Sequence, residues 1–304
     1  MKTSAELEKT GGNLTASKGS RVGAFVELMK LRLNTLVLVT TGIGFFLGSS
    51  TALDWWALTH TLLGTLLVAG GASALNQWME QDAEKVMRRT MDRPIPSGRV
   101  TPSEALVFGV VLSLAGLTYL SAAAPMITAL LAAATTASYL LLYTPLKKHT
   151  PICTWIGAIP GAIPPMIGWA AAYGSVTAEA WALFGILFWW QLPHFFAIAW
   201  LWRDDYQRAG YPMLTVLDPS GRLVSREIIV TTLALILAGC APYWLHMAGT
   251  VYLIGSLALG AAFLAFGAGL ARQKTDAAAR RLFFASIIYL PLLLTLLVAN
   301  RTVK

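Results

Sequence analysis

Long stretches without a charged residue dominate the chain. Seven of them have the length that a membrane-spanning helix requires, since about 20 apolar residues cross a bilayer. These stretches are Leu33–Leu53, Trp55–Met79, Ala105–Leu146, Thr150–Ala178, Ala180–Trp202, Ile228–Ala271 and Leu282–Asn300. The two longest have room for two helices each, with breaks expected near Ser121–Pro125 and His246–Gly249. The pattern predicts an all-α polytopic bundle of nine transmembrane helices.

Basic residues distinguish the two ends of this bundle. Of the 23 Lys and Arg residues, 21 lie in the N-terminal arm or in the loops after the second, fourth, sixth and eighth spans. Only Arg301 and Lys304 follow the ninth span. The positive-inside rule then places the N-terminus and these loops in the cytoplasm and the C-terminus outside. The net charge of +8 therefore reflects orientation and anionic lipid, and nucleic acid is not an expected partner.

Composition agrees with this class of protein. The chain is 56% hydrophobic and 12% charged, with a mean hydropathy of +0.61, which argues against a soluble protein. Residues 1–30 are predicted to form a flexible cytoplasmic arm, and residues 31–304 one membrane domain. Cys153 and Cys240 fall within spans without paired spacing, so we interpret them as small apolar residues.

A cluster of acidic residues follows the second span directly. Asn76, Glu80 and Glu84 are four residues apart, so a helix places them on one stripe. Asp82 points away from that stripe unless the segment unwinds. Carboxylate and amide oxygens suit Mg²⁺, which uses one or two carboxylates together with substrate phosphates. A solvated charged loop is the alternative, but acids where a bundle meets water usually indicate function.

Basic residues come immediately after these acids. Arg88, Arg89 and Arg93 precede Pro94 and Pro96, which stiffen the loop. Arginine can hold phosphate oxygens with two parallel hydrogen bonds. Acids and bases interleaved at the mouth of an apolar bundle suit a metal-bridged diphosphate whose hydrocarbon tail lies among the helices.

The fifth span is unusually rich in glycine and proline. Its small or ring-bearing residues are Gly157, Pro160, Gly161, Pro164, Pro165 and Gly168. Such a segment is typical of a kinked, tightly packed helix. A bent helix can also open room for a bulky flat substrate, and the two interpretations are compatible.

Four blocks, in order along the chain, resemble the signature of the UbiA prenyltransferase superfamily and, within it, of the protohaem IX farnesyltransferases. The blocks are Asn76–Glu84 with the following Met87–Pro94, Tyr143–Lys147, Gly161–Trp169, and Trp190–Phe195 with Asp204–Leu214. There are two departures. Glu80 and Glu84 stand where the family usually has Asp, and Asp204-Asp205 replaces the superfamily's second Asp-x3-Asp motif.

The resemblance implies transfer of a farnesyl group from farnesyl diphosphate to a vinyl group of haem b, giving haem O, with Mg²⁺ as cofactor. The implied metal ligands are Asn76, Glu80, Glu84, Asp204 and Asp205. The implied catalytic residues are these five together with Asp82 and Lys147. The implied substrate-binding residues are Arg89, Arg93, Tyr143, Gln191, His194 and Tyr206. His194 could ligate haem iron or only hydrogen-bond a neighbouring helix.

The implied setting is the bacterial inner (plasma) membrane, with the lipid bilayer around the protein. A terminal oxidase assembly or haem A synthase would take the product. Two alternatives stay open. One is a UbiA-type aromatic prenyltransferase acting on a quinone precursor such as 4-hydroxybenzoate, against which the fourth block argues. The other is a non-catalytic haem-binding or transport protein, but four scattered histidines do not supply paired haem ligands.

Overall fold

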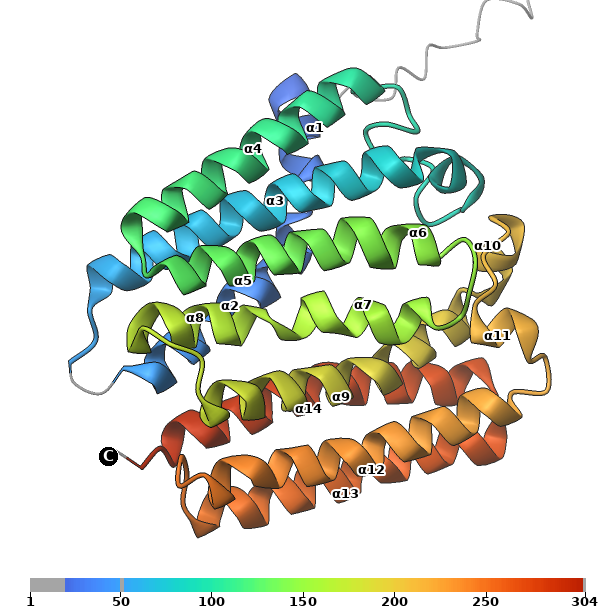
Figure 1. Ribbon diagram of the computed structural model, residues 1–304. Coiled ribbons are helices and arrows are strands. Elements are labelled where there is room, and N and C mark those ends of the chain that lie inside the picture. Colours follow the sequence, from blue (N-terminus) through green and yellow to red (C-terminus); the bar gives the residue numbers. More distant parts are fainter. Residues whose placement is uncertain (1–19, 50–51, 303–304) are drawn as a thin grey trace, which may run out of the picture.

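The computed structural model describes residues 20–49 and 52–302, in which the regular elements are helices. Within these ranges, eight helices are long and apolar enough to cross a membrane. They are α2 (Leu31–Gly48), α3 (Trp55–Val86), α4 (Pro102–Ala123), the continuous α5–η1–α6 (Met126–Leu146), α9 (Ala178–Leu201), α12 (Arg222–Trp244), α13 (Thr250–Gln273) and α14 (Asp276–Ala299). The predicted all-α membrane bundle is confirmed (Figure 1).

The ninth predicted crossing is made by two short helices. α7 (Cys153–Ala162) and α8 (Pro164–Tyr173) follow one another between α5 and α9 (Figure 1). Each has ten residues and is therefore about 15 Å long, half of the roughly 30 Å hydrocarbon core. Pro164 cannot donate a backbone hydrogen bond, which accounts for the interruption. The predicted kink in this span is present at Ile163, where α7 ends and α8 begins.

The expected breaks in the two longest stretches are also found. α4 ends at Ala123 and α5 (Met126–Ala137) begins two residues beyond Ala124. α12 ends at Trp244 and α13 begins at Thr250. Each break produces a pair of antiparallel neighbours, because the connection is too short to reach another part of the bundle.

The N-terminal arm differs from the expectation in its last part. Residues 1–19 lie outside the described ranges, but α1 (Arg21–Leu28) is an ordered helix that packs on α3. Leu28 is fully buried, and its carbonyl accepts a 2.8 Å hydrogen bond from Gln77 Nε2. Glu27 pairs with Arg99 at 2.6 Å. Residues 21–28 are therefore held against the bundle, whereas the sequence predicted a flexible arm over residues 1–30.

Side-chain caps fix where several membrane helices begin. Asp54 accepts hydrogen bonds from the backbone of the first turn of α3. Thr101 and Glu104 form a reciprocal capping box at the start of α4. Thr275 caps α14. Each cap satisfies backbone N–H groups that a helix leaves without partners at its first turn.

Glycines allow α2 and α8 to pack backbone against backbone. A Cβ atom at Gly44 would overlap the Pro165 carbonyl, and one at Gly168 would overlap the Thr41 carbonyl. Small residues at such a crossing let two membrane helices approach closely. The glycine–proline pattern of the fifth span thus serves helix contact as well as bending.

Gly44→Ala is expected to destabilise the protein by about 3 kcal/mol, because an inserted methyl group at a packed contact strains the surroundings. Gly42→Ala, in the same helix, is the matched control. Its Cβ would lie 3.9 Å from the nearest atom, so alanine's better helix propensity should leave stability unchanged or slightly higher. Thermal unfolding of both variants in detergent gives the comparison. Equal midpoints would contradict the packing described here.

The largest hydrophobic core cluster lies where α9 meets α12 and α14. The other side of α9 faces α7, and α8 in turn contacts α2, α3 and α5. A cavity remains among these helices. Its position matters because the acidic end of α3 lies beside it.

Candidate active site

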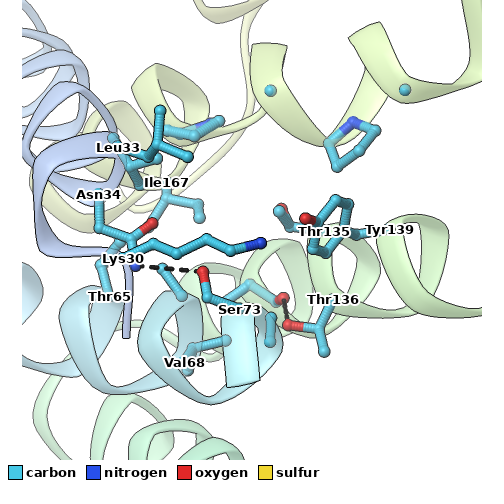
Figure 2. A pocket seen from close by; sticks show the side chains of 18 of the residues that line it. Lys30, Leu33, Asn34, Thr65, Val68, Ser73, Thr135, Thr136, Tyr139 and Ile167 are labelled. Carbon is cyan, nitrogen blue, oxygen red and sulfur yellow. Dashed lines mark hydrogen bonds between the residues drawn. The ribbon is translucent and has the colours of Figure 1, made fainter. Parts of the chain in front are cut away.

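A cavity of about 220 Å³ is lined by α2, α3, α5 with η1 (Ser138–Tyr143), α7, α8 and α9. Its wall is mostly apolar, and Figure 2 shows Lys30 extending into it beside Asn34 and towards Tyr139. Gly157, Pro160, Gly161 and Pro164 form part of the wall. The interrupted fifth span therefore does border open space, as the functional interpretation of its composition required.

The stripe predicted on α3 is present and buried. α3 continues as a regular helix to Val86, and Asn76, Glu80 and Glu84 are 3%, 4% and 0% exposed. Because the helix does not unwind, Asp82 points away from the stripe. Its side chain is 87% exposed and pairs with Lys85 at 2.9 Å. The structure thus separates Asp82 from the other acidic residues of the motif.

Each polar residue of the stripe contacts a different basic side chain. Lys30 Nζ donates to Asn76 Oδ1 at 3.0 Å. Lys147 Nζ lies 3.0 and 3.1 Å from the two Glu80 carboxylate oxygens. Arg93 pairs with Glu84. Buried charges require such partners, because removing a charge from water costs several kcal/mol. A row of three basic side chains from other segments therefore lies along the polar stripe at the end of α3.

The π-helix η1 sets the position of Lys147. It widens the last part of the fourth span, and α6 (Thr144–Leu146) follows it. Asn76 Nδ2 donates to Thr144 Oγ1 at 3.1 Å, which ties this segment to α3. The Lys147 ammonium lies 5.9 Å from the Tyr143 ring centre and 4.8 Å from that of Tyr211. Two aromatic faces and one carboxylate thus surround the cation.

The two lysines differ in their proton affinity. Burial alone would lower the pKa of Lys147, but the Glu80 carboxylate outweighs it and holds the pKa well above its usual value of 10.5. Burial lowers the pKa of Lys30 to about 7, and the nearby positive charge of Arg93 adds to this effect. Lys147 is thus a fixed cation, whereas Lys30 gains a stronger hold on its proton when an anion approaches.

The loop after α9 meets the loop after α3. Asp205, in α10 (Arg203–Arg208), is buried, accepts a 3.2 Å hydrogen bond from the Arg89 backbone N–H, and pairs with Arg208. The Arg89 guanidinium lies over the rings of Trp202 and Tyr206, at 5.7 and 5.9 Å. The ends of the second and sixth spans are therefore in direct contact, as a shared diphosphate site requires.

The neighbouring carboxylate does not join this contact. The Asp204 side chain is 83% exposed, and Arg203 Nε lies 3.9 Å from it. Of the Asp204-Asp205 pair, only Asp205 reaches the site. It does so by holding the loop of Arg89 through the backbone N–H of that residue.

Gln191 and His194 of α9 contact different neighbouring helices. Gln191 lines the cavity and donates to the carbonyls of Ala158 and Leu187 at 3.3 and 3.0 Å. His194 instead faces α14, where its Nδ1 lies 2.7 Å from Ser286 Oγ. Its ring stacks with those of Trp190 and Phe283. The geometry therefore favours a helix-to-helix hydrogen bond for His194 over ligation of haem iron.

The donor set of the α3 stripe fits magnesium. Among the described residues, no three His, Cys, Asp or Glu side chains converge closely enough to hold a metal ion. Glu84 Oε2, however, is buried without a hydrogen-bond partner. Such an orphaned oxygen suits a ligand from outside the protein. Mg²⁺ usually binds one or two carboxylates and completes its shell with water and phosphate oxygens, so the residues that could hold it are Glu84, Glu80 and Asn76.

Several residues of the site were missed by sequence reasoning. Lys30, Tyr139, Thr144 and Tyr211 all contact the stripe or its partners. Lys30 stands before the first span and was counted only as an orientation marker. A usable signal was Asn34, a buried amide one turn into an otherwise apolar stretch.

Asp205→Asn is expected to lower the rate of product formation by about 10- to 100-fold, the usual cost of losing a residue that orients a ligand-binding group. The amide would keep one acceptor for the Arg89 N–H but lose the ion pair with Arg208. Asp204→Asn should stay within about twofold of the wild type. Initial rates in isolated membranes measure both. If both variants lost the same fraction of the wild-type rate, the conclusion that Asp205 reaches the site and Asp204 does not would be contradicted.

The comparisons with known proteins agree with this geometry. The model of the UbiA prenyltransferase family matches residues 37–288. A "Protoheme IX farnesyltransferase" of Solibacter usitatus is 46% identical over 286 residues, covering 91% of this chain and 98% of that protein. One of Koribacter versatilis is 42% identical over 289 residues, covering 92% of this chain and 93% of that protein.

Solved structures show the same fold. A digeranylgeranylglyceryl phosphate synthase superimposes with a TM-score of 0.78 at 17% identity, covering 92% of this chain and 98% of its own. A UbiA homologue from Archaeoglobus fulgidus, bound to DMAPP and Mg²⁺, gives 0.65 at 14% identity, covering 90% and 98%. The chain belongs to the UbiA prenyltransferase family and, within it, to the protohaem IX farnesyltransferases.

Proposed function

We propose that the protein transfers the farnesyl group of farnesyl diphosphate to a vinyl group of haem b, giving haem O and releasing diphosphate. Its relatives carry the name of this enzyme. One observation links the charged stripe to the apolar cavity: Lys30 lines the cavity and donates to Asn76. A diphosphate at the stripe and a hydrocarbon chain in the cavity can therefore belong to one bound molecule.

In this proposal Asn76, Glu80 and Glu84 hold Mg²⁺, in line with the metal named for the Archaeoglobus fulgidus relative. Magnesium supplies positive charge that stabilises the leaving diphosphate. Arg93 and Lys147 are fixed beside these carboxylates and bring further positive charge to the diphosphate oxygens. Asp205 anchors the loop that carries Arg89, and the Arg89 guanidinium is a further group that can bind the diphosphate.

The proposed reaction proceeds through two carbocations, which form one after the other. The allylic C–O bond breaks, and its electron pair leaves with the diphosphate. The terminal vinyl carbon of haem b bonds to C1 of the farnesyl cation, which moves the positive charge to the inner vinyl carbon. Water adds there, and its proton passes to the diphosphate. An apolar cavity limits competing capture of the farnesyl cation by water.

The protein is a multi-pass membrane protein. For its orientation we propose a cytoplasmic N-terminus and an outer C-terminus in the bacterial inner membrane. The basic loops and α10 lie at one end of the bundle, and the C-terminus lies at the other (Figure 1). This arrangement supports a cytoplasmic active site under the positive-inside rule. The product would pass to haem A synthase or to a terminal oxidase assembly.

Incubating membranes that contain the protein with labelled farnesyl diphosphate tests the proposal directly. Haem b is expected to become labelled, whereas 4-hydroxybenzoate is not. Labelling of the aromatic acid instead would identify a quinone-precursor enzyme. A purified protein that retains stoichiometric haem but never turns over would identify a haem carrier.

A further inference from the structure

Asn34 is a buried amide in the first membrane helix, and it lines the cavity. Its Nδ2 donates to the Met29 carbonyl at 2.6 Å and to Ser73 Oγ at 3.4 Å, the second bond being drawn in Figure 2. Because the Met29 carbonyl needs a donor, these contacts fix which amide atom is nitrogen. In the described part of the chain, no protein donor reaches Asn34 Oδ1. A hydrogen-bond acceptor is therefore left over in the cavity wall.

The Asn34 acceptor lies close to the stripe of Asn76, Glu80 and Glu84. Ser73 precedes Asn76 by three residues on α3, about 4.5 Å nearer the interior of the bundle. Lys30, one turn before Asn34 in sequence, donates to Asn76. With a diphosphate at the stripe, C1 of its prenyl chain is the first atom on the cavity side. The vinyl carbon that becomes cationic is two bonds from C1, so the proposed function puts it within about one helical turn of the stripe, the depth at which Asn34 and Ser73 lie.

We infer that Asn34 and Ser73 hold the water molecule that adds to the haem vinyl cation, an inference that rests on the proposed function. A buried water needs two to four polar partners. The Asn34 carbonyl oxygen accepts from the water, and the Ser73 hydroxyl accepts from Asn34 and keeps its own hydrogen to donate. The water oxygen bonds to the inner vinyl carbon, and the released proton goes to the diphosphate. The product is the hydroxyethylfarnesyl substituent.

Other polar groups in the cavity are less well placed. The hydroxyls of Thr135 and Thr136 donate to carbonyls one turn earlier in their own helix. Thr65 lies eight residues before Ser73 on α3, about 12 Å farther from the charged stripe. Of these groups, only the Asn34–Ser73 pair combines an unused acceptor with a position one turn from the stripe.

Without a held water, the cation has a second outcome. It loses a proton to the diphosphate and becomes an alkene, which gives a product one water molecule lighter than haem O. The ratio of the hydroxylated to the dehydrated product therefore reports on water capture, separately from turnover. A residue that only supported the break between α1 and α2 would change the total rate and leave this ratio alone.

The test uses the full-length protein in membranes with farnesyl diphosphate and haem b, in water enriched in ¹⁸O, with mass analysis of the extracted pigments. The wild type should form haem O carrying ¹⁸O. In Asn34→Leu, the ratio of hydroxylated to dehydrated product should fall about tenfold, the factor that corresponds to losing one hydrogen bond. Ser73→Ala should shift the ratio in the same direction by a smaller factor. Thr136→Val, which also removes a cavity hydroxyl, should keep the wild-type ratio.

The outcomes are distinct. A wild-type ratio in Asn34→Leu, whether turnover is normal or slow, would overturn the inference, and so would a similar shift in Thr136→Val. If Asn34→Leu does not fold, a wild-type ratio in Ser73→Ala decides against it. A wild type that forms no farnesylated haem at all would overturn the proposed function, and this inference with it.

Discussion

Replacing Glu84 with glutamine is expected to lower kcat/KM for haem farnesylation by about 10³-fold or more. The Glu84 side chain is fully buried, one of its oxygens pairs with Arg93, and the other has no partner. Glutamine keeps the shape but removes the negative charge with which a carboxylate binds Mg²⁺. Stabilisation of the departing diphosphate, worth several kcal/mol, is then lost. Initial rates with labelled farnesyl diphosphate at several Mg²⁺ concentrations provide the measurement.

Asp82→Asn is the matched control for this variant. It removes a carboxylate two residues away on the same helix, but one that is exposed and paired with Lys85. Its rate should remain within about twofold of the wild type, because exposed ion pairs contribute little. If Glu84→Gln kept normal activity, or if Asp82→Asn lost it, the magnesium site would not be the stripe described here.

The second large effect concerns stability. Lys147→Met is expected to lower the free energy of unfolding by about 3–5 kcal/mol, since it leaves the buried Glu80 carboxylate without its counter-ion. Pairing the substitution with Glu80→Gln removes both charges and should recover most of the loss. Activity should stay low in the double variant, because the proposed function assigns both groups to the diphosphate site. Denaturation in detergent and product formation give the two readouts.

Lys148→Met serves as the control, because Lys148 is the exposed neighbour of Lys147. It should leave stability and rate near the wild-type values. A single variant Lys147→Met as stable as the wild type would show that Glu80 has another partner or is neutral. A double variant less stable than Lys147→Met would show that the pair is not coupled as its geometry indicates.

The sequence was sufficient for the architecture because the membrane constrains it strongly. The uncharged stretches determine the helices, and the basic loops determine which ends lie together. The stripe of Asn76, Glu80 and Glu84 also followed from helical periodicity, and the structure brings the three onto one buried face. Even the separation of Asp82 from them follows from the same periodicity once α3 is known to stay regular.

Contacts between distant segments could not be predicted in this way. Lys30 stands in a left-handed backbone conformation between α1 and α2, and this bend turns its side chain towards Asn76. Only Asn34, one turn further along the chain, distinguishes this lysine from one that marks orientation. The rotation of α9, which sends Gln191 to the cavity and His194 to Ser286, likewise depends on packing against α7 and α14.

The neighbouring acids Asp204 and Asp205 illustrate the same limit on a smaller scale. They are identical in type and adjacent, yet one is exposed and the other buried. Which of them faces the protein depends on where α10 starts and on how its first turn is tilted. Asp205 faces the loop of Arg89, whose backbone N–H donates to it from more than a hundred residues earlier in the chain.

The backbone contact between α2 and α8 also has a consequence for biogenesis. The chain between them contains every element from α3 to α7, so α2 enters the bilayer long before its glycine-lined partner is synthesised. Until then, that flank of the nascent protein can only face lipid. Contacts so distant in sequence form slowly, since a large loop must close first. The α8 side of the cavity is therefore completed at a late stage of co-translational assembly, and a chain that stops before Pro164 would lack this wall.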